Sequence, residues 1–199
     1  METTRTFVAL PLSEDLETQT RKVQRELARL VPNCVRWVKP EKAHLTLAFL
    51  GNVLVDQHQQ LLFRVERTAQ AFAPPRLALG GVGCFPDVRR PRVVWVGLEG
   101  EIVKLRQIQQ EVSNATQGFG EHQEERDFHP HLTIGRINRV RDGATDSFAE
   151  AFRLLADSPA IEWIPQRIHV IASQLSPSGP VYRDLGVVPF LGHSAEAKG

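Results

Sequence analysis

The chain has 199 residues, of which 42% are hydrophobic and 24% charged, and this composition is typical of one ordinary globular domain. The formal net charge is only +1, which argues against a protein that coats duplex nucleic acid through many phosphate contacts. Arg far outnumbers Lys among the 24 basic residues, and the planar guanidinium matches phosphate oxygens in a bidentate way. The charge therefore permits recognition of one phosphate or of a nucleic-acid end, and a genomic bias toward Arg codons is the alternative explanation.

Cysteine usage and hydropathy argue against two further classes of protein. Cys34 and Cys84 follow no CxxC spacing, so neither a disulfide scaffold nor a zinc finger is expected. The longest apolar runs, such as residues 93–98, are too short to cross a bilayer. Acidic residues follow a short apolar run at the N-terminus, which is unlike a secretory signal. We therefore expect a cytoplasmic protein without a membrane partner, and we take a monomer as the default.

Hydrophobic periodicity and turn residues predict short strands interspersed with helices. In chain order, the first half is expected to hold a strand at 5–12, a helix at 14–30, strands at 35–38 and 44–50, and a helix at about 56–72. The second half is expected to hold strands at 77–85 and 92–98, a helix at about 101–117, a strand at 131–137, a helix at about 146–156, and strands at 161–164, 167–175 and 182–188. Ser13 is the predicted N-cap of the first helix. The apolar stripe of that helix is predicted to consist of Leu16, Val23, Leu27 and Leu30.

This order of elements indicates an α+β fold. The strands arrive as hairpin-like pairs separated by single helices rather than in strict βαβ alternation. A motif repeated along the chain suggests two similar halves, each a small sheet with helices on one face. No linker rich in Pro, Gly or Ser separates the halves, so residues 1–192 are expected to form a single domain, followed by a flexible tail at 193–199.

The repeated motif is His-Leu-Thr followed by an aliphatic residue. It occurs in HLTLAFLG, which begins at His44, and again in HLTIGR, which begins at His131. Alternate side chains of a strand share a face, so each copy should present an imidazole beside the hydroxyl of Thr46 or Thr133. In the first copy, strict alternation places three apolar residues on the opposite face: Leu45, Leu47 and Phe49.

Two imidazoles and two hydroxyls that converge on one groove suit acid–base chemistry at phosphorus. An unperturbed His titrates at about pH 6.5, so at neutral pH one ring can act as a base while the other carries a proton. One ring then deprotonates the attacking oxygen, and the other protonates the leaving oxygen of an in-line displacement. The Thr hydroxyls can donate hydrogen bonds to the non-bridging phosphate oxygens, and this chemistry requires no metal.

Two other interpretations of these histidines stay open from the residues alone. A single partly buried His in a strand is commonly structural, although repetition of the whole motif favours a function. Asp127, His129 and His131 alternate and could ligate zinc. A zinc site gives no reason for the two Thr residues or for the repetition of the pattern at His44.

At these residues the chain resembles the two-histidine phosphoesterase superfamily, whose signature is a pair of His-x-Thr/Ser-x motifs. It is more closely similar to the bacterial and archaeal RNA 2′,3′-cyclic phosphodiesterases, also called 2′-5′ RNA ligases. The resemblance covers about residues 5–190. Four segments carry it: RTFVALPLSEDL, GVGCFPDVRRPRVVWVGLEG, RDFHPHLTIGR and SQLSPSGPVYRDLGVVPF.

The resemblance implies a bilobal fold with an active-site cleft between two pseudo-twofold-related lobes, each with a small, mainly antiparallel sheet flanked by helices. It also implies hydrolysis of a terminal RNA 2′,3′-cyclic phosphate to a 2′-phosphate, without a metal or another cofactor. His44 stands at the family's proton donor and His131 at its proton acceptor. Thr46 and Thr133 stand at the phosphate-binding hydroxyls of the family.

Two arginines near the second motif are candidate substrate-binding residues. Arg136 matches a basic position that follows the family's second motif, although strict alternation would place it on the face opposite to His131. Arg126 is the other candidate, for which a surface salt bridge to nearby acidic residues is the alternative. His129 stands where the family often has an aromatic or basic residue. We expect it to add nothing catalytic, and contact with a phosphate by its protonated ring is the alternative.

The expected substrates are RNA 3′ ends or tRNA fragments that bear a 2′,3′-cyclic phosphate, and small cyclic nucleotides. Reverse ligation to a 2′-5′ linkage is expected to be weak, because water favours hydrolysis. An RNA-end or nucleotide binding module without turnover is the alternative from another functional class. Mutation of the two histidines separates the hypotheses, because in an enzyme it should remove turnover and spare binding.

Overall fold

The structure, a computed structural model of the 199-residue chain, describes every residue except 32, 122–126, 139–143, 157–160, 178 and 193–199. The strands of the described part are β1 (Thr3–Pro11), β2 (Val35–Trp37), β3 (His44–Leu54), β4 (Leu77–Phe85), β5 (Val93–Gly100), β6 (His131–Ile137), β7 (Ile161–Trp163), β8 (Arg167–Ser176) and β9 (Gly179–Pro189). The helices are α1 (Glu14–Leu30), α2 (His58–Gln70), α3 (Ile102–Ala115), α4 (Ala144–Leu155) and two short 3-10 helices, η1 (Pro40–Lys42) and η2 (Val55–Gln57). Every predicted strand and α-helix is present with ends shifted by a few residues, and the α+β class is confirmed. The tail expected at 193–199 lies outside the described residues.

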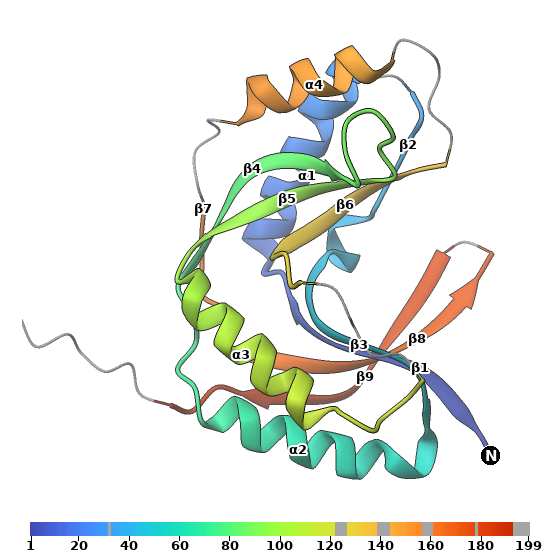
Figure 1. The fold of residues 1–199 in the computed structure, drawn as a ribbon, viewed down its shortest axis with the longest axis vertical. Coiled ribbons are helices and arrows are strands. Elements are labelled where there is room, and N and C mark those ends of the chain that lie inside the picture. The colour runs from blue at the N-terminus through green and yellow to red at the C-terminus, as the bar shows by residue number, and fades with distance from the viewer. Residues whose placement is uncertain (32, 122–126, 139–143, 157–160, 178, 193–199) are drawn as a thin grey trace, which may run out of the picture.

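The strands form one sheet in the order β7-β4-β5-β6-β3-β1-β8-β9, with β2 paired to β6. The two central strands, β3 and β6, meet antiparallel through a single residue pair, Leu45 with Leu132. These leucines are the second residues of the two motif copies. The sheet therefore has two halves that join where the two copies of the motif lie side by side (Figure 1).

Two of the helices, α1 and α3, are exchanged between the two halves of the sheet. Helix α1 follows β1 in the chain, yet it packs with α4 beside the half that contains β4, β5 and β6 (Figure 1). Helix α3 follows β5, yet it contacts β3 and α2 on the other half. Each half is thus covered by a helix that comes directly after a strand of the other half.

The buried face of α1 differs from the predicted stripe. Leu16 and Leu27 are buried as expected, whereas Leu30 is 40% exposed, so that prediction was wrong. Thr20 and Gln24 occupy the buried positions between the two leucines. Hydrophobic periodicity cannot identify a buried glutamine, because its burial depends on hydrogen-bond partners elsewhere in the fold.

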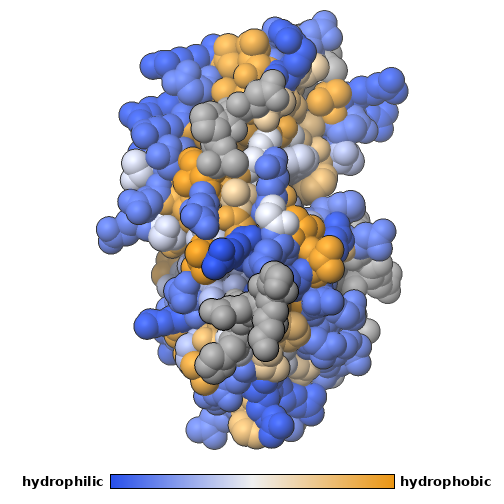
Figure 2. Space-filling view, turned by 90° about the vertical axis from the view of Figure 1, so that its left-hand side faces the viewer, coloured by the Kyte–Doolittle hydropathy of each residue, from blue (hydrophilic) through white to orange (hydrophobic). Residues whose placement is uncertain are grey.

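The outer surface carries hydrophobic side chains in small, separate groups. Figure 2 shows one face of the molecule, which is mostly hydrophilic with scattered hydrophobic residues. Exposed examples come from several elements, among them Phe63 of α2, Leu154 of α4 and Leu175 of β8. Scattered exposure of this kind is normal for folded proteins. In the described part of the chain, no helix is both long and apolar enough to cross a membrane.

Candidate active site

The two copies of the motif line one cavity of about 570 Å³. Its lining includes His44 and Thr46 from β3, together with His131 and Thr133 from β6. Further walls come from β1, from the segment that joins β2 to β3 through η1, and from the β8–β9 hairpin. The structure therefore brings all four predicted motif residues to the same cavity.

Both imidazoles are oriented in the same way by the backbone that precedes them. Nδ1 of His44 lies 2.9 Å from the carbonyl oxygen of Lys42, and Nδ1 of His131 lies 2.7 Å from the carbonyl oxygen of His129. A carbonyl oxygen can only accept a hydrogen bond, so Nδ1 carries the hydrogen in both rings. Nε2 is therefore the atom of each ring that is left to gain or lose a proton.

Aromatic side chains pack against each imidazole. The ring of Phe7 stacks on that of His44 with 4.7 Å between centroids, and Tyr182 meets His44 edge-on at 5.6 Å. Phe85 meets the ring of His131 edge-on at 4.9 Å. These contacts remove water from one side of each ring and restrict its rotation, so the direction of each Nε2 is held by packing as well as by hydrogen bonding.

A β-bulge follows the Thr of each motif copy. The pairing of β3 with β1 skips Leu47, and the pairing of β6 with β5 skips Ile134. An extra residue in one strand reverses the face on which the following side chains project. Phe49 and Arg136, each five positions after the motif His, consequently line the cavity, and the faces predicted by strict alternation were wrong for both.

Two glutamines bind the backbone at these bulges. Gln24 of α1 donates from Nε2 to the carbonyl oxygen of Ile134 at 2.9 Å, and Gln109 of α3 donates to the carbonyl oxygen of Leu47 at 3.2 Å. A bulge disrupts the ladder of the strand pair locally, and these hydrogen bonds replace part of the lost pairing. The exchanged helices therefore hold the two bulges in equivalent ways.

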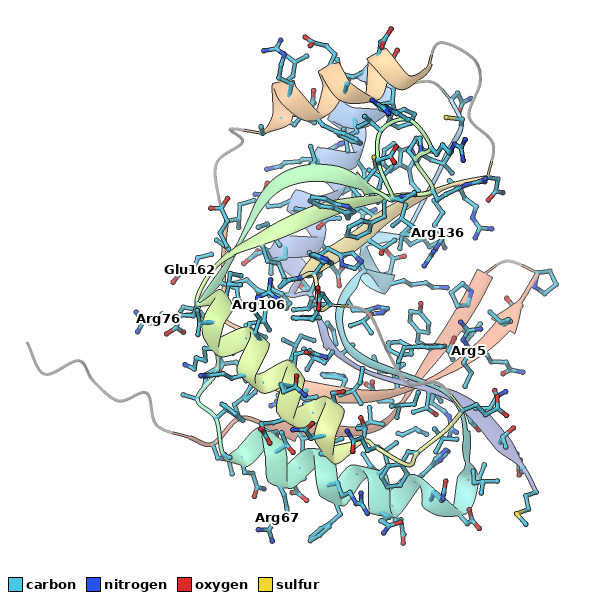
Figure 3. All side chains as sticks on the ribbon, viewed as in Figure 1. Arg5, Arg67, Arg76, Arg106, Arg136 and Glu162 are labelled. Atoms are coloured by element: carbon cyan, nitrogen blue, oxygen red, sulfur yellow. The ribbon has the colours of Figure 1, made fainter. Side chains whose placement is uncertain are left out.

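The cavity has a strongly positive lining. None of the described lining residues is acidic, and five are basic: Arg5, Arg36, Lys39, Lys42 and Arg136. Among the residues that the structure describes, none of the five lies within 4.0 Å of a carboxylate oxygen. Arg36 and Arg136 are direct partners across β2 and β6, where like charges repel. Figure 3 shows Arg5 and Arg136 on opposite sides of the opening between the two halves of the sheet. Such a lining favours an anionic ligand.

The same surroundings lower the pKa of both imidazoles. For His44, burial is the main cause, and the hydrogen bond to the carbonyl of Lys42 opposes it. Burial also lowers the pKa of His131, against the hydrogen bond to the carbonyl of His129. The positive charge of Arg136 contributes to the lowering in both rings. Without an anion in the cavity, both rings are therefore biased toward the neutral form.

We expect the maximum of kcat/KM for cyclic phosphate opening to lie below pH 6.5, the ordinary pKa of His. If the two imidazoles act as the predicted acid–base pair, one ring must be protonated and the other neutral. The maximum then lies between the two pKa values of the free enzyme, and both are lowered. Initial rates at low substrate concentration from pH 4.5 to 8.5 measure this profile. A maximum above pH 6.5 would contradict the expectation.

Among the residues that the structure describes, Asp127 and His129 do not line the cavity. Arg126 lies outside the described residues. Asp127 and His129 are exposed, and within the described part of the chain no group of three or more His, Cys, Asp or Glu side chains could hold a metal ion. The zinc interpretation built on Asp127, His129 and His131 therefore has no structural support from these residues.

Several cavity residues were missed from the sequence. Arg5 lies far from both motifs along the chain, Arg36 and Lys39 precede the first motif without belonging to its pattern, and Phe7 and Tyr182 look like ordinary strand residues. The excess of Arg over Lys was the only signal for the basic ones. That excess cannot tell which guanidinium groups reach a common cavity, because the answer depends on strand pairing.

Comparison with known proteins shows to which family this chain belongs. Residues 20–176 match the model of the 2′-5′ RNA ligase superfamily. The chain is 32% identical to the RNA 2′,3′-cyclic phosphodiesterase of Methanothermobacter thermautotrophicus over 187 residues, covering 92% of this chain and 97% of the relative. It is also 32% identical to the protein of that name from Archaeoglobus fulgidus, covering 92% of this chain and 98% of the relative.

Solved structures show the same architecture. TT0787 of Thermus thermophilus superposes with a TM-score of 0.76 at 26% identity, covering 96% of this chain and all of that one. E. coli LigT, crystallised with 3′-AMP, superposes with a TM-score of 0.70 at 25% identity, covering 95% of this chain and 99% of that one.

Proposed function

This chain belongs to the 2′-5′ RNA ligase superfamily, and on that premise we propose that it is an RNA 2′,3′-cyclic phosphodiesterase that opens terminal cyclic phosphates to 2′-phosphates. Its proposed substrates are RNA 3′ ends, tRNA fragments and small nucleotides that carry the cyclic phosphate. The two relatives described above, which carry this activity in their names, match over 97% and 98% of their length. Reverse ligation to a 2′-5′ linkage would use the same groups in the opposite direction.

The observation that carries the proposal is the pair of imidazoles on one cavity, each with Nδ1 bonded to backbone and Nε2 left for proton transfer. Phosphate ester cleavage needs one group to take a proton from the nucleophile and another to give one to the leaving oxygen. Two rings from neighbouring antiparallel strands provide both groups. The basic lining supplies the charge that attracts the phosphate.

In the proposed mechanism, Nε2 of His131 takes a proton from a water molecule as the water oxygen attacks phosphorus. The P–O3′ bond breaks on the opposite side, and His44 gives its Nε2 proton to O3′. The hydroxyls of Thr46 and Thr133 and the guanidinium of Arg136 bind the non-bridging oxygens, where negative charge gathers. The step leaves His131 protonated and His44 neutral, and proton exchange with solvent restores the starting state.

The proposal predicts a single product isomer. With purified protein in EDTA, adenosine 2′,3′-cyclic phosphate should be converted to adenosine 2′-phosphate, because the fixed donor protonates O3′ only. Phosphorus NMR or chromatography against both isomers measures the outcome. A predominant 3′-phosphate would contradict the assignment of His44 and His131 while leaving a two-histidine mechanism standing. No opening of any cyclic phosphate between pH 4.5 and 8.5 would contradict the function itself.

A further inference from the structure

Arg5 is a cavity arginine that the mechanism above does not use. It lies on β1, and its guanidinium carbon is 4.8 Å from the centroid of the Phe49 ring. Phe49 takes the place in the first motif copy that Arg136 takes in the second, because each follows a bulge. The cavity therefore has a guanidinium group at equivalent places in both halves, one supplied directly by the motif strand and one held on the ring of Phe49.

Arg5 lies apart from Arg136, and its charge is not among those that lower the pKa of the two imidazoles. Arg136 is the guanidinium whose charge lowers the pKa of both His44 and His131. The charge of Arg5 acts instead on Tyr182, whose pKa burial raises and the charges of Arg136 and Arg5 lower. Figure 3 shows the same separation, with Arg136 and Arg5 on different halves of the sheet.

Tyr182 contacts the ring of His44 and lines the same cavity as Arg5. Its ring is in T-shaped contact with the rings of His44 and Phe7, at centroid distances of 5.6 and 5.3 Å, and its side chain lines the cavity. A ribose and base attached to a phosphate between the imidazoles would therefore have an aromatic surface in the same cavity that Arg5 lines. Aromatic rings offer bases a stacking surface that is independent of sequence.

Resting on the proposed function, we propose that Arg5 forms a second anion subsite, which binds the phosphate on the 5′ oxygen of the nucleoside whose cyclic phosphate is opened. The substrate class is thus RNA ends and 5′-phosphorylated nucleotides in preference to 5′-hydroxyl nucleosides. A guanidinium held on a ring has lost part of its mobility before binding, and its fork fits phosphate oxygens. The absence of any carboxylate within 4.0 Å among the described residues leaves its charge for such a ligand.

The test compares three substrates that share one reacting group. Adenosine 2′,3′-cyclic phosphate has a 5′-hydroxyl, its 5′-phosphorylated form adds only the phosphate, and the dinucleotide ApA with a terminal cyclic phosphate supplies it as an RNA diester. Wild-type kcat/KM should be about tenfold or more higher for the two phosphorylated substrates. Arg5→Gln should bring both ratios close to one. The salt dependence of these two substrates should also become shallower in the variant, by ~0.7 in logarithmic slope.

Two matched variants distinguish a specific phosphate subsite at Arg5 from attraction by the overall positive potential of the cavity. Arg64→Gln removes another guanidinium that lies over a phenylalanine, 5.1 Å from the centroid of Phe119, outside the cavity lining. It should leave all three rates and both ratios as in the wild type. Arg36→Gln removes an equal charge from the β2 wall of the same cavity. It should change the ratios by much less than Arg5→Gln does.

Each result decides one of the two proposals. Wild-type ratios close to one, or ratios that Arg5→Gln leaves unchanged, would overturn the subsite and leave the hydrolase standing. Equal losses from Arg36→Gln and Arg5→Gln would assign the preference to the general positive potential and overturn the role of Arg5. If wild-type protein opened none of the three substrates, the proposed function would fail first, and the subsite with it.

Discussion

Alanine at His131 or at His44 is expected to lower kcat by about 10²–10⁴-fold, while affinity for adenosine 2′-phosphate changes by less than roughly tenfold. In the proposed mechanism each Nε2 transfers one proton in the same step, so loss of either ring removes half of the acid–base pair. Single-turnover opening of adenosine 2′,3′-cyclic phosphate measures the first effect, and titration calorimetry with the 2′-phosphate measures the second.

His169→Ala is the matched control for these variants. His169 lies on β8 of the same sheet, pairs with Asp184 through Nδ1 at 3.1 Å, and is outside the cavity lining. Its removal should leave kcat unchanged. Loss of ligand binding in the His44 and His131 variants, together with no measurable wild-type turnover, would favour a nucleotide-binding module instead.

The two histidine variants should also differ from one another. A substrate with sulfur in place of O3′ needs less protonation of its leaving group, so it should restore much of the rate in His44→Ala and little in His131→Ala. The pH profile of the residual rate of His44→Ala should no longer fall at alkaline pH, because that fall reflects loss of the proton from the donor. If the sulfur-containing substrate restored the rate of His131→Ala and not that of His44→Ala, His131 would be the proton donor and His44 the proton acceptor.

Arg136→Ala is expected to lower kcat/KM by about 10²–10³-fold, because in the proposed mechanism the guanidinium binds oxygens on which charge gathers during the reaction. The variant should also shift the maximum of the pH profile upward, since the charge that lowers the pKa of both imidazoles is gone. Arg136→Lys should recover part of the rate, because an ammonium keeps the charge and loses the fork.

Arg64→Ala is the control for Arg136. It removes an arginine from α2 that does not line the cavity, so both the rate and the pH profile should match the wild type. Melting temperatures of all variants show whether any loss of rate comes from unfolding. If Arg136→Ala kept its rate within about threefold of the wild type and its pH maximum unmoved, a phosphate contact by Arg136 would be excluded.

The sequence by itself determined the elements and the central motif. Apolar alternation and turn residues located the strands and helices to within a few residues, because these signals are local. The repetition of His-Leu-Thr at His44 and His131 indicated that two imidazoles share one cavity, and period-two geometry predicted that Thr46 and Thr133 line the same cavity, as they do.

Only the tertiary structure decided what surrounds that motif. The bulges at Leu47 and Ile134 depend on pairing with β1 and β5, and local alternation therefore gave the wrong face for Phe49 and Arg136. The glutamines that bind these bulges come from exchanged helices. A periodic pattern cannot register such contacts, since it records how one segment faces a core and not which distant segment meets it.

The positive cavity lining shows the same limit. Arg5 and Arg36 stand on different strands, and each looks in the sequence like an ordinary exposed residue. Their grouping with Arg136 follows from the order of strands in the sheet, which brings β1 beside β3 and β2 beside β6. Electrostatic potential sums charges over space, so it becomes visible only when the folded chain has fixed the distances between them.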